Sequence, residues 1–98
     1  MVKHVIIWKL KDEYKDRESK KREIKDQLEG LVGKIPGLRE MNIIYDPMKG
    51  STGDILMDSY FDDAASLAAY QKNFLHLEIA NTVVRPAVEV RLSFDYEV

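Results

Sequence analysis

The sequence predicts an α+β fold in which helices cover one face of a four-stranded antiparallel sheet. Two observations carry this prediction. The spacing of apolar residues alternates along the chain between the period of a strand and the period of a helix, in the order βαββαβ. The chain also has only 98 residues, the length of one ordinary domain, and no linker, repeat or low-complexity tract divides it. We therefore expect a single domain over residues 1–98.

The first predicted elements are a strand and a long helix. The strand covers residues 2–10, and its apolar centre, residues 5–8, indicates burial on both faces. The helix is expected over roughly residues 16–34, and Pro36-Gly37 ends it because proline cannot continue a helix. Five residues at the helical period form its apolar stripe: Ile24, Leu28, Leu31, Val32 and Ile35.

The rest of the chain completes the order. Two strands, at about 38–45 and 54–61, flank a loop rich in glycine and other turn-forming residues. Asp62-Asp63 can cap a helix over 64–71, and a second short helix is expected over about 75–84. A strand follows over about 87–96, where apolar and polar residues alternate strictly.

These elements predict a ferredoxin-like arrangement with one uncovered sheet face. Right-handed crossovers place both helical segments on the same side of the sheet. The first strand nevertheless presents apolar residues to both sides, and the third does so in part. An exposed apolar sheet face is an aggregation hazard, which a second copy could cover in a two-fold interface. The expected partner is therefore the chain itself, as a homodimer through the open sheet face.

Composition excludes several other partners. The formal net charge is −2, from 15 basic and 17 acidic residues, which gives no reason to expect nucleic acid or a membrane surface. No apolar run approaches the ~20 residues that span a bilayer. The chain has no cysteine, which excludes disulfides, cysteine nucleophiles and thiolate metal sites. This composition fits a cytoplasmic protein.

Four segments of the sequence resemble a known family. They are Val2-Lys3-His4-Val5-Ile6-Ile7-Trp8-Lys9-Leu10-Lys11-Asp12-Glu13, Leu67-Ala68-Ala69-Tyr70-Gln71 with His76, Val84-Arg85-Pro86-Ala87-Val88, and Arg91-Leu92-Ser93-Phe94-Asp95-Tyr96-Glu97. In this order and spacing they are similar to the Dabb domain, the stress-responsive A/B barrel, over essentially the whole chain. The resemblance implies the fold above, with two sheets facing each other in a dimeric α+β barrel.

The resemblance also implies a site. Family members include stress-linked plant proteins, bacterial proteins of unknown role and a plant polyketide cyclase. By motif position, the cyclase implies that Tyr70 and His76 act on substrate and that His4 lies nearby. The family commonly reads His-Pro-x-His where this chain has Asn73-Phe74-Leu75-His76, so the first histidine and the proline are absent here.

The resemblance and the predicted fold together imply that His4 and His76 approach one small-molecule pocket between sheet and helices. A histidine near neutral pKa can exchange a proton at physiological pH, so we expect His76 to act as a general base. Tyr70 would orient a substrate oxygen or share in the proton transfer. Ile6 and Trp8 share the strand face of His4, and Leu28 belongs to the helix stripe. We expect His4, Ile6, Trp8 and Leu28 to bind the ligand, in the manner of an apolar pocket with few polar groups.

Packing roles compete with these assignments. His4 can be a hydrogen-bonded core histidine, Tyr70 a packing residue and Trp8 part of the core. Two histidines without a carboxylate at ligand spacing make a poor metal site, so no metal and no cofactor are expected.

The last strand carries a further pair of charged residues. Arg91 and Asp95 lie on one face of it and could bind an anion. A structural ion pair with Asp58 or Glu89 is the expected role.

Three functions remain open from the sequence. The first is a pocket that binds an aromatic or polyketide-like compound, with cofactor-free cyclase or lyase chemistry. The second is a non-catalytic stress-protective or binding module. The third is a cofactor-free monooxygenase. Whether the protein is an enzyme is left undecided by these patterns.

Overall fold

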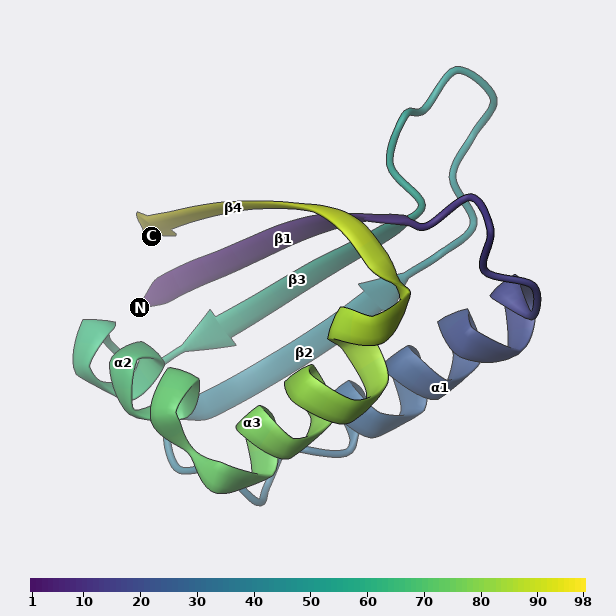
Figure 1. Ribbon diagram of the computed structural model, residues 1–98. Helices are drawn as coiled ribbons and strands as arrows, with labels where there is room; N and C mark the ends of the chain where they lie inside the picture. The colour runs from purple at the N-terminus through teal and green to yellow at the C-terminus, as the bar shows by residue number, and fades with distance from the viewer.

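The computed structural model describes residues 1–98 and contains the predicted α+β order (Figure 1). The helices and strands are β1 (Val2–Leu10), α1 (Arg17–Glu29), β2 (Leu38–Ile44), β3 (Ile55–Phe61), α2 (Ala64–Lys72), α3 (Phe74–Ile79) and β4 (Val88–Glu97). After α3 the chain continues through a π-helical turn, Ala80–Val84, and a 3-10 turn, Arg85–Ala87, into β4. The predicted short helix over 75–84 is thus an α-helix followed by a π turn.

The sheet has four antiparallel strands in the order β2-β3-β1-β4. The helices lie together on one side of it, and the other side has no covering element (Figure 1). This is the ferredoxin-like fold, so the predicted fold class is confirmed. No helix is both long and apolar enough to cross a membrane.

The core lies between the sheet and the helices. Alternate residues of β1, including Ile6, Trp8 and Leu10, point into it because strand side chains alternate between faces. Ile24 and Leu28 of α1 meet them from the helical side.

The first helix is shorter than predicted. It ends at Glu29 instead of about residue 34. Gly30 caps it, and the chain then turns with Gly33 at φ 90°, a conformation that a helix cannot contain. Leu31 and Ile35 are still buried in these turns, but Val32 is 42 % exposed, so its place in the apolar stripe was wrong.

Two contacts fix the start of α2. The Asp63 side chain accepts a hydrogen bond from the Ser66 backbone N–H at 2.7 Å, which lowers the pKa of that carboxyl. Gly37 has φ 83°, and a Cβ there would lie 2.3 Å from the Ser66 hydroxyl. Only glycine therefore allows the connection before β2 to approach α2 this closely. These contacts hold the start of α2, the helix that carries Tyr70.

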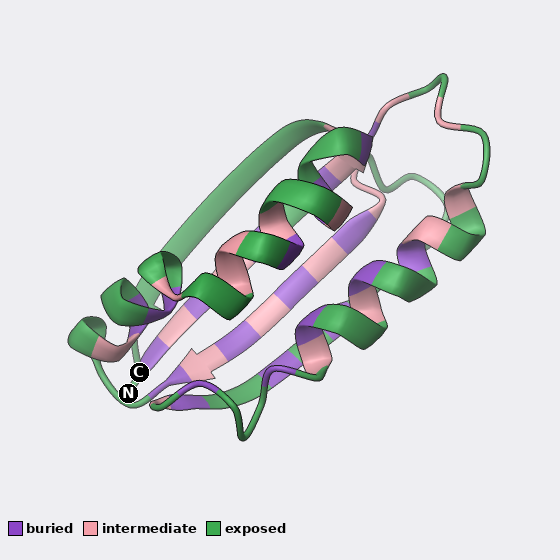
Figure 2. Ribbon diagram, turned by 60° about the horizontal axis from the view of Figure 1, so that its bottom comes forward, coloured by how far each residue is buried: buried purple, intermediate pink, exposed green.

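The open sheet face is apolar, as predicted. Its exposed large side chains come from three strands: Ile7, Ile44, Val90, Leu92, Phe94 and Tyr96. Strand β4 contributes most of them, and Leu92 and Phe94 are 63 % and 69 % exposed. Figure 2 shows β4 exposed along nearly its whole length. The helices thus also leave the inward side of β4 uncovered, and a cavity lies beside it.

Candidate functional site

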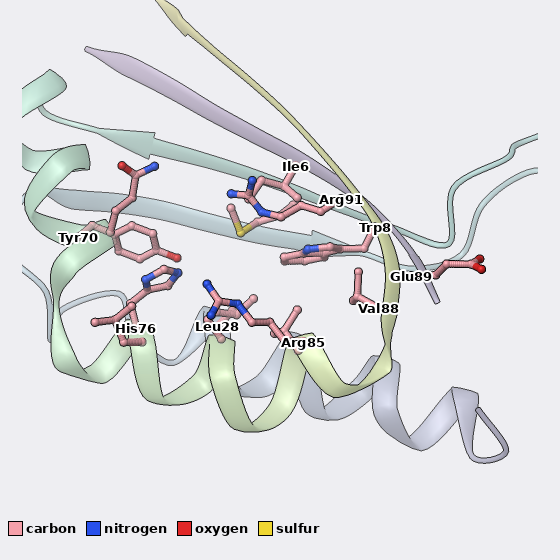
Figure 3. Close-up of a pocket in the computed structure, with 14 residues that line it drawn as sticks. Ile6, Trp8, Leu28, Tyr70, His76, Arg85, Val88, Glu89 and Arg91 are labelled. Atoms are coloured by element: carbon pink, nitrogen blue, oxygen red, sulfur yellow. The ribbon is translucent and has the colours of Figure 1, made fainter. Parts of the chain in front are cut away.

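A cavity of about 480 Å³ lies between the sheet and the segment that links α2 to β4 (Figure 3). Of the 14 residues that line it, 9 are hydrophobic. Ile6 and Trp8 of β1 and Leu28 of α1 form apolar walls. The sequence placed these three residues at a common pocket, and the structure brings them together there. A cavity of this size and lining suits a small organic molecule.

Tyr70 and His76 also line the cavity, at the junction of two helices. Tyr70 lies near the end of α2, and His76 lies in the first turn of α3. Asn73 breaks the helix between them with an extended backbone, and its side chain accepts a hydrogen bond from the Leu75 N–H at 2.9 Å. This break between the helices lets the Tyr70 and His76 rings pack against each other, with their centroids 4.2 Å apart.

Both side chains keep a polar atom without a protein partner. The Tyr70 hydroxyl and His76 Nδ1 are buried and form no hydrogen bond. Leaving such a group unpaired typically costs about 1–3 kcal/mol, so most buried polar atoms are paired. In Figure 3 the Tyr70 hydroxyl points toward the middle of the cavity. Two unpaired atoms at one cavity indicate a place where a ligand would complete the hydrogen bonding.

Burial sets the protonation of this pair. It lowers the pKa of His76 below its ordinary value of 6.5, and the positive charges of Arg85 and Arg91 act in the same direction. A backbone hydrogen bond to Gln71 opposes the change. Burial also raises the pKa of the Tyr70 phenol. At neutral pH the imidazole can therefore accept a proton while the phenol remains a hydrogen-bond donor.

The lowered pKa of His76 predicts a pH-dependent stability. Below about pH 6.5 the unfolded chain binds a proton at this residue that the folded chain binds only at lower pH. The free energy of unfolding should therefore fall as the pH drops through 6.5 toward the folded pKa. Urea unfolding at pH 7.5 and 5.5 should show a larger loss for the wild type than for His76→Gln. If the wild type and His76→Gln lose the same unfolding free energy between the two pH values, the fold does not keep His76 neutral.

Two arginines at the cavity were not among the predicted site residues, although anion binding by Arg91 was one of the alternatives. Arg91 of β4 and Arg85 of the 3-10 turn both line it. We expected Arg91 to pair with Asp58 or Glu89, and this was wrong. Asp58 instead pairs with Lys3 at 2.8 Å, and Glu89 lies 3.8 Å from Lys9. The register of β4 against β1 places Arg91 opposite Trp8 on the inward face.

His4 lies behind the site and does not line the cavity. Its ring is buried, and its centroid is 6.4 Å from that of Tyr70. His4 Nδ1–H donates to Asp95 Oδ1 at 2.5 Å, because a carboxylate can only accept. The assumption that no carboxylate accompanies the histidines was therefore wrong. The contact joins β1 to β4 on the inward face and fixes the ring beside Tyr70.

The chain contains no cluster of three or more histidine, cysteine or acidic side chains that could hold a metal ion. His4 and Asp95 form only a pair.

The comparison with protein families identifies the fold's relatives. The family model of the stress responsive A/B barrel domain, Dabb, matches residues 2–98. The chain belongs to the Dabb family. The predicted family is thereby confirmed over essentially the whole sequence. No protein of curated function matches the chain.

Several solved structures superpose closely on this one. A dimeric protein of unknown function with a ferredoxin-like fold from Bacteroides fragilis has 27 % identity and a TM-score of 0.89, covering 99 % of this chain and 95 % of its own. A hydroxynitrile lyase from Passiflora edulis has 18 % identity and a TM-score of 0.76, covering 97 % and 90 %.

A third similar structure is described as a putative antibiotic biosynthesis monooxygenase, from Nitrosomonas europaea. It has 14 % identity and a TM-score of 0.78, covering 100 % of this chain and 98 % of its own. At such identities the last two show a shared fold and do not assign chemistry to this Dabb protein.

Proposed function

We propose that this Dabb protein is a homodimer whose cavity binds an aromatic or polyketide-like small molecule, with His76 as general base. The proposal rests on one observation. Two buried polar atoms, the Tyr70 hydroxyl and His76 Nδ1, have no hydrogen-bond partner, and both residues line an apolar cavity. Leaving both groups without hydrogen bonds lowers the stability of the folded protein, and a ligand that bonds to them would recover that free energy.

The geometry supports proton removal from a ligand that carries a carbonyl or hydroxyl group. The His76 imidazole would take the proton and become an imidazolium. The Tyr70 hydroxyl would donate a hydrogen bond to the ligand oxygen on which negative charge gathers. The apolar walls would hold the ring or chain of the ligand and exclude water. Lyase and cyclase reactions can both start with such a step, and the Passiflora lyase is an enzyme on this fold.

The dimer part of the proposal rests on the open sheet face. The exposed apolar side chains of β1, β2 and β4 form one continuous surface opposite the helices. A two-fold partner would bury the same surface on both protomers. The Bacteroides fragilis relative is described as dimeric, which supports this arrangement.

A proton-exchange assay tests the catalytic part without knowledge of the natural substrate. The probe is 4-hydroxyacetophenone, a neutral aromatic ketone with exchangeable methyl protons. In D₂O, NMR should show methyl exchange accelerated by the wild type over buffer. His76→Ala should lower the enzymatic rate about 100-fold or more, because a positioned general base contributes that much. If the probe binds but its methyl exchange is not accelerated, the catalytic proposal is wrong and a non-catalytic binding module remains.

A matched pair of variants tests where the probe binds. Ala80 lines the cavity, and Ala80→Phe should fill it and abolish binding. Thr82 lies two residues further on the same turn, exposed and outside the cavity lining. Thr82→Phe should therefore leave binding unchanged. Equal binding by both variants would place the ligand elsewhere. Circular dichroism should confirm that both variants fold.

A further inference from the structure

The cavity holds two guanidinium groups that no carboxylate neutralises. Arg91 extends from β4 and Arg85 from the 3-10 turn, so they approach from opposite walls (Figure 3). None of the ion pairs in the structure involves either arginine. Arg85 donates only to the neutral side chain of Asn81, at 2.5 Å.

The acidic residues around the cavity do not compensate this charge. Glu89 is the one acidic residue of the lining, but its carboxylate points away from the cavity in Figure 3 and faces Lys9. Asp95 is occupied by His4. Of the remaining polar lining residues, Gln71 carries no charge, and burial favours the neutral forms of Tyr70 and His76. The cavity is therefore a region of positive potential with hydrogen-bond donors and no internal anion.

This charge also acts on the pair beside it. The positive charge of Arg91 lowers the pKa of both Tyr70 and His76, although burial is the larger cause at each residue. Arg91 thus lies close enough to act on a charge held between them. An anion at this position would be attracted by both arginines and would complete the donors left free.

We propose that the ligand of this cavity carries a carboxylate on an aromatic or apolar body, and that Arg91 and Arg85 select it. This rests on the proposed function, because it names the class of compound that the same cavity binds. The apolar body lies against Ile6, Trp8 and Leu28. The carboxylate lies toward the two guanidinium groups, whose planar forks match it geometrically. Neutral compounds of equal shape bind more weakly.

The test compares benzoate with benzamide, which share size and shape but differ in charge. Titrations followed by NMR on the full chain give a dissociation constant for each. We expect the wild type to bind benzoate about 10- to 100-fold more tightly, the range for a charge-assisted hydrogen-bonded pair. Arg91→Gln and Arg85→Gln should each reduce this preference while leaving benzamide binding nearly unchanged. Arg22→Gln, an exposed arginine of α1 outside the lining, is the matched control and should retain the preference.

The outcomes separate this inference from the proposed function. Equal affinities for benzoate and benzamide, both lost in Ala80→Phe, would overturn the carboxylate selection and leave the small-molecule cavity standing. Inorganic phosphate that binds as tightly as benzoate would also overturn it, since no apolar body would then be needed. If neither aromatic probe shifts the resonances of cavity residues at millimolar concentration, both the inference and the proposed cavity function fail.

Discussion

Replacing Leu92 and Phe94 together by aspartate is expected to make the protein monomeric. Both side chains project from β4 on the open sheet face, where they are among the most exposed apolar groups. Burying one such side chain contributes about 1.5–3 kcal/mol, and the two-fold interface contains each of them twice. The variant would also bury like charges near their symmetry mates. We expect the dissociation constant of the dimer to rise at least about 1,000-fold.

Analytical ultracentrifugation distinguishes the outcomes. The wild type should sediment with twice the chain mass of 11.3 kDa, and the double variant with that mass once. Phe74→Asp is the matched control, because Phe74 is 73 % exposed but lies on the helical side of the sheet. A wild-type monomer at micromolar concentration, or a double variant that remains dimeric, would show that the sheet face is not the interface.

Two substitutions of Tyr70 should affect the stability of the fold differently, because one removes the ring and the other removes only the hydroxyl. Its ring is 1 % exposed and packs against Phe61 with centroids 4.9 Å apart, so Tyr70→Ala should cost about 3–5 kcal/mol of unfolding free energy. Tyr70→Phe keeps the ring and removes a hydroxyl that has no partner. Removing an unsatisfied buried group should be neutral or stabilising, by up to about 1 kcal/mol.

The same Tyr70→Phe variant should lose the accelerated exchange of 4-hydroxyacetophenone. The measurements are urea unfolding at pH 7.5 and the exchange rate in D₂O. A protein that retains a hydroxyl at a cost in stability, and needs it for activity, fits a functional site. If Tyr70→Phe instead loses more than about 1 kcal/mol, the hydroxyl has a structural partner and is not free for a ligand.

Much of the fold follows from residue periodicity. The apolar centre of β1 and the alternation along β4 predict both strands. Alternation does not tell which face of β4 turns inward, because its apolar residues lie on the open face and Arg91 lies on the inward face. The apolar residues left over on the second face predict the open surface that the structure shows. The pocket walls Ile6, Trp8 and Leu28 were also predictable, because strand face and helix stripe point to the same core.

The rest depends on contacts between residues distant in sequence. The pairing of His4 with Asp95 requires the register of β1 against β4, which a single sequence does not reveal. The same register places Arg91 beside Trp8 at the cavity, whereas charge pattern alone suggested an ion pair. The end of α1 at Glu29 depends on the left-handed turn at Gly33, and the apolar stripe continues past it. Buried residues can therefore continue at the spacing of a helix after the helix itself has ended.

The most direct test of the cavity is a crystal structure of the dimer grown with benzoate. The account predicts an open cavity with the ring against Trp8 and Leu28 and the carboxylate between Arg85 and Arg91. The Tyr70 hydroxyl should face the bound molecule without a protein partner. A cavity closed by Trp8 or by the partner subunit, with the Tyr70 hydroxyl bonded to a backbone carbonyl, would contradict the account.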